Sequence, residues 1–220
     1  MPCRYKINIA LVEQSLRAVQ MRFDEINETL EMRREAMQDE IVANMLAGYA
    51  YVNMLLERNI NPLHPKQLHH ILELNNIVLC GTSQKARIDY KGYIEATKHR
   101  FYRQAHFSIS NIRAWAEKHK KDTAYKRAAG IYILQISRPQ LFEEGNHRSG
   151  ALLMSSILVD SGKAPFVLTV DNAKAYFDPS SLAKETHKNL FGKYYKLPKI
   201  KKKFSRFLQR ESNLQLLTKS

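Results

Sequence analysis

The chain has 220 residues and a mass of 25.6 kDa, long enough to bury a hydrophobic core without disulfides. Hydrophobic residues make up 44% and charged residues 25%, which excludes a disordered chain and a protein with many membrane spans. Cys3 and Cys80 form neither a disulfide framework nor a Cys-x-x-Cys metal site. There is no run of ~18 apolar residues, and residues 1–6 do not have the apolar character of a secretory signal. We expect a cytoplasmic protein, a description that an effector exported without a signal also fits.

Positive charge is concentrated near the C-terminus. The formal net charge is +14, and residues 191–220 contribute seven Lys and two Arg against one Glu. Basic and aromatic residues are interleaved there: Lys196, Lys199, Lys201, Lys202, Lys203, Arg206 and Arg210 lie among Tyr194, Tyr195, Phe204 and Phe207. Such a segment could contact nucleic acid or an anionic membrane. We favour a C-terminal helix with a solvated basic face and an aromatic face packed on the body, because most basic runs are solvated faces.

Residues 8–58 have the periodicity of long amphipathic helices. Apolar residues recur at spacings of three and four, first at Leu16, Val19, Phe23, Ile26 and Leu30, and then at Ile41, Met45, Val52 and Leu55. This pattern predicts two helices, or one helix that bends near residues 31–34. The prolines in residues 59–65 end the second helix. A shorter helix is expected over residues 66–79.

A β-hairpin is predicted over residues 86–102. Ile, Tyr, Thr and Phe are frequent in this segment, and these residue types favour strands. Gly92 lies near the middle, where a hairpin needs a turn. We therefore expect two short strands here, the only β structure that the sequence indicates.

The remainder of the chain is predicted to be helical. Ser110 and Asp122 are suitable N-caps, and Gly162 is a suitable C-terminal glycine. Helices are expected over 110–120, 122–137 and 146–161, from Ser180 or Ser181 onward, and in the last thirty residues. No internal repeat or low-complexity linker divides the sequence. We expect residues 1–220 to form a single, mainly α-helical domain with a small hairpin.

The segment 138–162 carries the strongest chemical signal. A helix ends at a proline, a short loop holds Glu143 and Glu144, and a new helix begins after Gly145. The unpaired N–H groups and the positive dipole at a helix start favour an anion, and Arg148 adds a bidentate phosphate donor. The segment is not a P-loop, because Ala151 stands where the lysine is required. A second interpretation is a capped helix in which Arg148 pairs with Glu143 or Glu144.

Residues 142–148, Phe-Glu-Glu-Gly-Asn-His-Arg, resemble the core of the Fic (Fido) domain motif, His-x-Phe-x-(Asp/Glu)-Gly-Asn-(Gly/Lys)-Arg-x-x-Arg. The resemblance extends to Tyr-Lys-Arg-Ala-Ala at 125–129, which is similar to the alanine-rich helix before the motif. It also includes the helix and Gly-x-x-Pro turn that end at Pro165. We expect a Fic-like core over 40–195, an N-terminal helical extension over 1–39 and a basic C-terminal helix over 196–220.

The resemblance implies a Fic-like helical bundle with a β-hairpin flap, which transfers AMP from ATP to a hydroxyl group of a target protein. It implies that Glu144 binds Mg²⁺ and that the phosphates of ATP or another nucleotide bind at Gly145, Asn146 and Arg148. Phe142 corresponds to the packed aromatic anchor of the motif. The hairpin at 86–102 would be the flap that holds a protein target by strand addition.

Three positions depart from the motif. Gln140 stands in place of the histidine that acts as the general base, Ala151 replaces the second arginine, and His147 replaces a small residue. Glutamine does not titrate, and a general base typically contributes ~10²–10⁴ in rate. His147 is a candidate substitute base and a candidate phosphate contact. The sequence thus predicts a Fic-like nucleotide-binding protein with weakened or altered transfer of AMP. A non-catalytic module that binds a nucleotide or a protein is the alternative.

Overall fold

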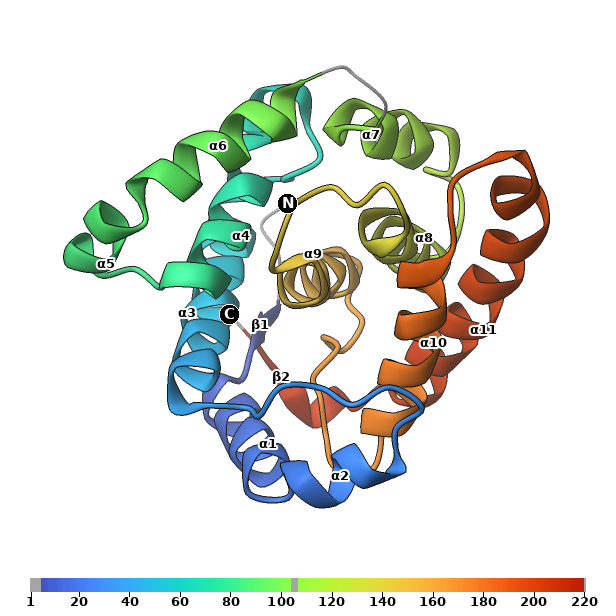
Figure 1. The fold of residues 1–220 in the computed structure, drawn as a ribbon. Coiled ribbons are helices and arrows are strands. Elements are labelled where there is room, and N and C mark those ends of the chain that lie inside the picture. The colour runs from blue at the N-terminus through green and yellow to red at the C-terminus, as the bar shows by residue number, and fades with distance from the viewer. Residues whose placement is uncertain (1–4, 104–106, 220) are drawn as a thin grey trace.

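The structure is a computed structural model that describes residues 5–103 and 107–219. The expectation of a mainly α-helical protein is confirmed (Figure 1). The helices of the described residues are α1 (Ile9–Met21), α2 (Phe23–Thr29), α3 (Asp39–Glu57), α4 (His69–Cys80), α5 (Gln84–Asp89), α6 (Lys91–Tyr102), α7 (Ile109–Lys118), α8 (Ala124–Ile136), α9 (Asn146–Asp160), α10 (Ala173–Glu185) and α11 (Leu197–Arg210). Short turns of other helix types lie at Pro65–Gln67, Gly192–Lys196 and Leu214–Leu216.

Helix α9 runs through the middle of the molecule. It is seen nearly end-on at the centre of Figure 1, with α3, α4, α8 and α10 around it. Small residues allow its neighbours to approach closely, because a Cβ at Gly150 would lie 2.8 Å from the ring of Tyr132 in α8. The hydrophobic core therefore surrounds the helix that follows the candidate motif.

A two-stranded antiparallel sheet joins the two ends of the described chain. Strand β1 (Tyr5–Ile7) pairs with β2 (Leu217–Lys219), with Tyr5 opposite Lys219 and Ile7 opposite Leu217. Asn53 of α3 continues this pairing, since its side chain donates to the carbonyl of Ile7 and accepts from the Ile7 N–H. These strands are distant in sequence and do not form a hairpin.

The β-hairpin predicted over residues 86–102 is wrong, because this segment forms α5 and α6. The aromatic and β-branched residues fit a helix: Tyr93, Thr97 and Phe101 recur every fourth residue, and the last two are buried. Ser83 caps α5 by accepting from the N–H of Ala86. A flap that offers a strand edge to a protein target is therefore not present at 86–102.

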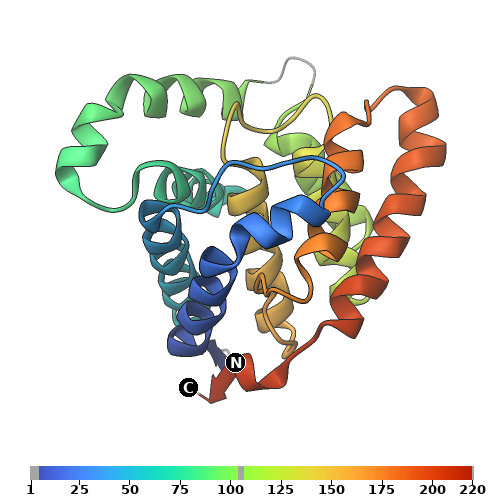
Figure 2. The same ribbon diagram turned by 60° about the horizontal axis from the view of Figure 1, so that its bottom comes forward.

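An extended segment, residues 30–38, connects α2 to α3, so the predicted long helices are interrupted where a bend was expected. We call residues 30–38 the strap. Asn27 fixes the strap by accepting from the backbone N–H of Arg34 and donating to the carbonyl of Arg34. The strap crosses the front of the molecule, near the start of α9 (Figure 2). It forms one wall of the candidate site.

The last two long helices pack against the body. Helix α10 begins at Ala173, earlier than predicted, directly after a turn in which the side chains of Asn172 and Thr169 each accept from the other's backbone N–H. In α11, Phe204 is fully buried and stacks on Tyr132 with ring centroids 4.9 Å apart. Of the aromatic residues expected to pack on the body, Phe204 and Phe207 are part of the core. Tyr194 and Tyr195 are exposed instead, because they lie in the turn before α11 and not on its buried side.

Candidate functional site at the start of helix α9

Gly145 forms the turn that starts α9. Its φ of +71° lies in the left-handed region, which costs a residue with a Cβ roughly 1–2 kcal/mol. A Cβ here would also lie 2.7 Å from Nδ2 of Asn75, which donates to the carbonyl of Glu144. The sequence therefore requires glycine at this position for both conformational and steric reasons.

Asn146 fixes the shape of the loop before the helix. Its side chain accepts from the N–H of Phe142 and donates to the carbonyl of the same residue, at 3.0 and 2.8 Å. Gln135 of α8 donates to the carbonyl of Asn146 and to the hydroxyl of Ser149. Asn146 is buried, so its side chain contributes rigidity to the site and its backbone N–H contributes a donor.

The first turn of α9 presents unpaired donors. The backbone N–H groups of Asn146, His147 and Arg148 have no hydrogen-bond acceptor among the described residues. These groups carry the positive end of the helix dipole, and such a turn stabilises an anion. The structure therefore begins a helix where the sequence predicted one and leaves these three N–H groups unpaired, with the backbone held by Gly145 and Asn146.

Arg148 lies beside this turn. One guanidinium nitrogen donates to the carbonyl of Val78 at the end of α4, at 2.7 Å. The alternative ion pairs of Arg148 are not found among the described residues, since Glu143 pairs with Arg100 and Glu144 forms no salt bridge. Burial lowers the pKa of Arg148 and the Glu144 carboxylate opposes this, but an arginine stays protonated in either case. The remaining N–H groups of the Arg148 guanidinium can donate hydrogen bonds to an anion.

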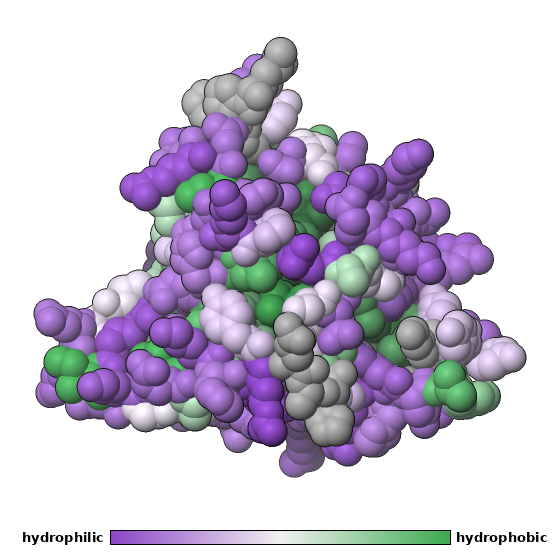
Figure 3. Space-filling view, turned by 90° about the horizontal axis from the view of Figure 1, so that it is seen from above, coloured by the Kyte–Doolittle hydropathy of each residue, from purple (hydrophilic) through white to green (hydrophobic). Residues whose placement is uncertain are grey.

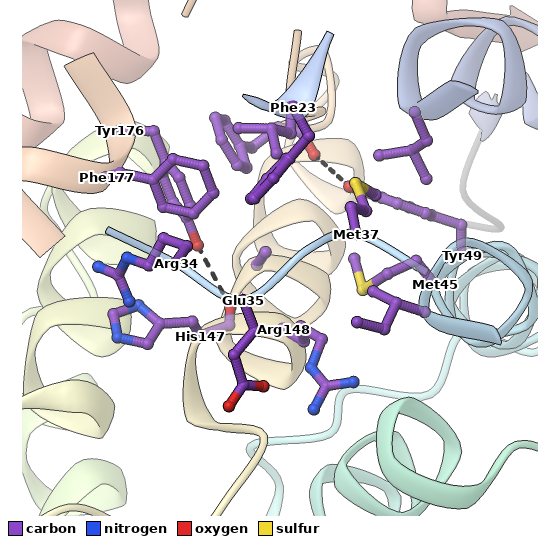
Figure 4. A pocket seen from close by; sticks show the side chains of 15 residues that line it. Phe23, Arg34, Glu35, Met37, Met45, Tyr49, His147, Arg148, Tyr176 and Phe177 are labelled. Carbon is purple, nitrogen blue, oxygen red and sulfur yellow. Dashed lines mark hydrogen bonds between the residues drawn. The ribbon is translucent and has the colours of Figure 1, made fainter. Parts of the chain in front are cut away.

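A cavity of about 160 Å³ adjoins the first turn of α9. Arg34, Glu35, His147 and Arg148 gather at one end of it (Figure 4). The rest of the wall is apolar and aromatic, formed by Phe23, Met37, Met45, Tyr49, Tyr176, Phe177 and their neighbours. A cavity with an apolar body and a charged end suits a ligand that has an apolar part and a charged group at one end.

The His147 imidazole belongs to a buried network. Its Nδ1 lies 3.0 Å from the Tyr132 hydroxyl, which also contacts the hydroxyls of Tyr176 and Ser180. Its Nε2 is buried without a partner among the described residues. Burial, with a smaller contribution from the charge of Arg34, lowers the pKa of His147 to about 3. This environment favours a neutral, structural imidazole and leaves the backbone N–H as the contact that His147 offers to a phosphate.

This pKa predicts a pH dependence of stability. The unfolded chain takes up a proton at His147 near pH 6.5, whereas the folded protein does so only near pH 3. Below pH 6.5 the unfolded state therefore binds more protons, and the free energy of unfolding should fall by up to about 1.4 kcal/mol per pH unit. We expect His147→Gln to flatten this slope in urea unfolding between pH 7 and pH 4. An unchanged slope would show that His147 takes up its proton at the same pH in the folded and unfolded protein.

Gln140 lies in the loop before the motif. Its amide nitrogen donates to the carbonyl of Ile136 at the end of α8, at 2.9 Å. The backbone carbonyl of Gln140 accepts from the guanidinium group of Arg100 in α6. The residue at the position of the missing base is thus held in place by α8 and α6, and it has no group that takes up a proton.

Phe142 is fully buried, as an aromatic anchor should be. Its ring stacks on Phe101 of α6, with centroids 5.5 Å apart and planes 3° from parallel. The Arg100–Glu143 pair lies next to this stack in the chain. Helix α6 therefore supports the motif loop from the side on which a hairpin flap was expected.

Sequence reasoning did not identify Lys188, which also holds this loop. Its ammonium group donates to the carbonyls of Ser137 and Pro139 and lies 3.7 Å from the centre of the Phe107 ring. These contacts favour the cation, while burial lowers the pKa of Lys188 to about 7. Lys188 is a lysine within a basic segment, so nothing in its sequence context distinguishes it from the solvated lysines.

Glu144 is the residue that the sequence analysis assigned to Mg²⁺. It is exposed at the mouth of the loop, and no cluster of three potential ligands exists among the described residues. Mg²⁺ is commonly held by one or two carboxylates together with the substrate phosphates. Glu144 fits that arrangement, in which the ion binds with the phosphate and not before it.

Comparisons with known proteins bear on the fold. No family model matches the sequence, and no curated protein matches it. A solved structure of a fragment of Fic-1 from C. elegans is similar, with a TM-score of 0.50 and 19% sequence identity. The match covers 92% of this chain and 62% of that chain, so this chain spans less than two thirds of the length of its structural neighbour. At this identity the likeness shows a Fic-like fold and no more.

None of the described helices has the length and apolar character needed to cross a membrane.

Proposed function

We propose that this chain binds the phosphate group of a nucleotide at the start of α9 and transfers the nucleotidyl group slowly or not at all. The observation that carries the proposal is the first turn of α9. There, three unpaired backbone N–H groups and Arg148 meet beside an apolar cavity. The Fic-like fold of the chain and the resemblance of residues 142–148 to the Fic motif support the proposal.

The charges around the turn favour an anion with a counter-ion. Arg148 and Arg34 outnumber the single carboxylate of Glu35 at the charged end of the cavity, and oriented N–H groups add to their attraction for phosphate. Glu144 lies in the same loop, and Mg²⁺ bound there with the phosphates would neutralise part of their charge. Arg148 and the N–H groups would then hold the phosphate oxygens that the ion does not reach.

The cavity is suited to the nucleoside part of the ligand. Aromatic rings of Tyr176 and Phe177 and the thioether of Met37 line it, and such side chains contact the flat apolar faces of bases. The charged end lies toward the first turn of α9 (Figure 4). A ligand with its phosphate on the N–H groups would therefore direct its apolar part toward the cavity.

Neither Gln140 nor His147 supplies a general base for transfer. A hydroxyl that attacks a phosphate must lose its proton, yet Gln140 cannot accept one and the pKa of His147 is lowered to about 3. The site retains electrostatic stabilisation of a charged phosphate, which does not depend on a base. These features favour binding over turnover, and they support the non-catalytic nucleotide-binding module as the second candidate function.

Calorimetric titration with ATP, CTP and GTP tests the proposal through a matched pair of arginines. Arg148 and Arg87 both donate to carbonyls at the end of α4, those of Val78 and Gly81, but only Arg148 lies beside the first turn of α9. We expect Arg148→Gln to weaken nucleotide binding by roughly 10- to 100-fold, the value of a hydrogen bond to a charged group. Arg87→Gln should change the affinity little, although it also removes the ion pair with Glu73.

Two outcomes would contradict the proposal. One is a wild-type protein that binds none of the nucleotides. The other is an equal loss of affinity in both arginine variants, which would show that stability of α4 and not contact with phosphate controls binding. Thermal unfolding of each variant, measured in parallel, separates unfolded protein from folded protein with an altered site.

A further inference from the structure

Four large apolar side chains are exposed together between α10 and α11. Leu190, Phe191, Tyr194 and Tyr195 are 77%, 59%, 63% and 62% exposed. They lie at the corner where the chain turns into α11, at the upper right of Figures 1 and 2. A soluble surface carries single exposed apolar residues without consequence, but a contiguous group indicates an interaction site.

The group is ordered by its own contacts. The rings of Phe191 and Tyr195 stack with centroids 5.5 Å apart, and the ammonium group of Lys196 lies 5.6 Å from the centre of the Phe191 ring. Because the rings hold one another, little conformational freedom remains to be lost when a partner binds. We call Leu190, Phe191, Tyr194 and Tyr195 the apolar corner.

A basic face continues from the apolar corner along α11. The inner side of this helix is buried in the core. Six exposed basic residues form the basic face: Lys196, directly before the helix, and Lys199, Lys202, Lys203, Arg206 and Arg210 on its outer side. Of these six, only Arg210 forms a salt bridge with a described residue. The sequence has no Asp or Glu from residue 186 to residue 210. The right side of Figure 3, where α11 lies, is accordingly mostly hydrophilic, with a small hydrophobic area.

We propose that the apolar corner and the basic face of α11 together dock on an anionic lipid membrane. Lysines near such a surface are attracted to its lipid headgroups, and exposed Leu, Phe and Tyr side chains can enter the interface between headgroups and acyl chains. Each element alone binds weakly, whereas a basic patch next to an apolar anchor gives stable attachment. The proposal concerns a surface separate from the start of α9 and does not depend on nucleotide binding.

The form of the apolar corner favours lipid over nucleic acid. Proteins that bind single strands use open aromatic faces on which successive bases stack. Here Phe191 and Tyr195 already cover each other, and Leu190, the most exposed of the four, has no aromatic face. A contiguous apolar group flanked by lysines is complementary to an anionic bilayer surface.

Co-sedimentation of the full chain with vesicles tests the proposal. The vesicles are phosphatidylcholine alone, or phosphatidylcholine with about one third phosphatidylserine. We expect binding only to the anionic vesicles, with partition lowered roughly 100-fold by the triple change Lys199→Glu, Lys202→Glu and Lys203→Glu, since each lysine contributes a several-fold factor. The double change Leu190→Ser and Phe191→Ser should also lower partition onto the anionic vesicles, and by more than added salt lowers it for the wild-type protein.

The control variant carries Lys118→Glu, Lys121→Glu and Lys126→Glu, which changes the net charge equally at exposed positions of α7 and α8 and the turn between them. This variant should keep most of the binding. The proposal is wrong if the wild-type protein shows no preference for anionic vesicles, or if both triple variants lose binding equally. Binding of RNA or DNA by a protein that ignores the vesicles would instead assign the surface to nucleic acid. All of these changes are exposed, so unaltered thermal unfolding confirms that the variants are folded.

Discussion

Replacing Gly145 with alanine is expected to lower the free energy of unfolding by about 2–5 kcal/mol and to weaken nucleotide binding. The left-handed backbone at Gly145 disfavours a Cβ, and that Cβ would lie 2.7 Å from Nδ2 of Asn75. Asn75 cannot move freely, because the same nitrogen bonds to the carbonyl of Glu144. Relief of the clash would therefore shift the loop that presents the N–H groups of α9.

Gly92 provides the matched control for this experiment. It lies in α6 without a positive φ, and no atom lies within 4 Å of the position that a Cβ would take there. Gly92→Ala should raise stability by about 0.5–1 kcal/mol, the usual gain for alanine in a helix. Denaturant unfolding gives both values. A Gly145→Ala protein as stable as the wild type, with unchanged affinity, would show that the turn does not need glycine.

Replacing Gln140 with histidine is expected to raise any nucleotidyl transfer by up to ~10²–10⁴-fold, the usual contribution of a general base. Gln140 donates to the carbonyl of Ile136. An imidazole at this position could make the same bond through its Nδ1–H, which would leave Nε2 unprotonated and able to accept a proton. The nucleotide affinity should stay the same, because the N–H groups and Arg148 are unchanged.

Transfer from labelled ATP to protein, measured beside calorimetric affinity, checks this expectation. Gln140→Asn is the control, since it shortens the side chain without adding a titratable group. A wild-type protein that modifies a target quickly, and slows when Gln140 becomes histidine, would give Gln140 an active role and contradict our account. Ala151, in place of the second arginine of the motif, limits the gain, because it supplies no donor to the leaving phosphates.

The start of α9 could be predicted from sequence because it depends on adjacent residues. Gly145, the N–H groups after it and Arg148 follow one another in the chain, so their grouping required only that a helix begin there. The buried ring of Phe142 followed from the resemblance to the Fic motif in the same way. Local spacing thus carried most of the information about the motif.

The hairpin prediction failed because it weighed residue type over spacing. Ile, Tyr, Thr and Phe are frequent in strands, but the four-residue spacing of Tyr93, Thr97 and Phe101 places them on one side of a helix. Stacking of Phe101 on Phe142 then stabilises the helical form. Tertiary contacts of this kind routinely override the weak preferences of individual residues.

The environment of His147 could not be predicted from its neighbours in sequence. Tyr132, whose hydroxyl contacts the imidazole, comes from α8, and Tyr176, whose hydroxyl donates to the carbonyl of His147, comes from α10. The charged end of the cavity likewise depends on Arg34 and Glu35, which the strap carries across the molecule. Contacts between distant segments decide both features, and one sequence does not specify which segments meet.

The central claim is that the N–H groups of the first turn of α9 bind a phosphate. The most direct measurement is the change in backbone amide resonances of isotope-labelled protein as ATP is added. Our account predicts that the largest changes occur at Asn146, His147 and Arg148, with smaller ones along the cavity, and that Arg148→Gln reduces them. Changes confined to the lysines of α11, with the first turn of α9 unaffected, would show that ATP binds only to the basic surface and would contradict the claim.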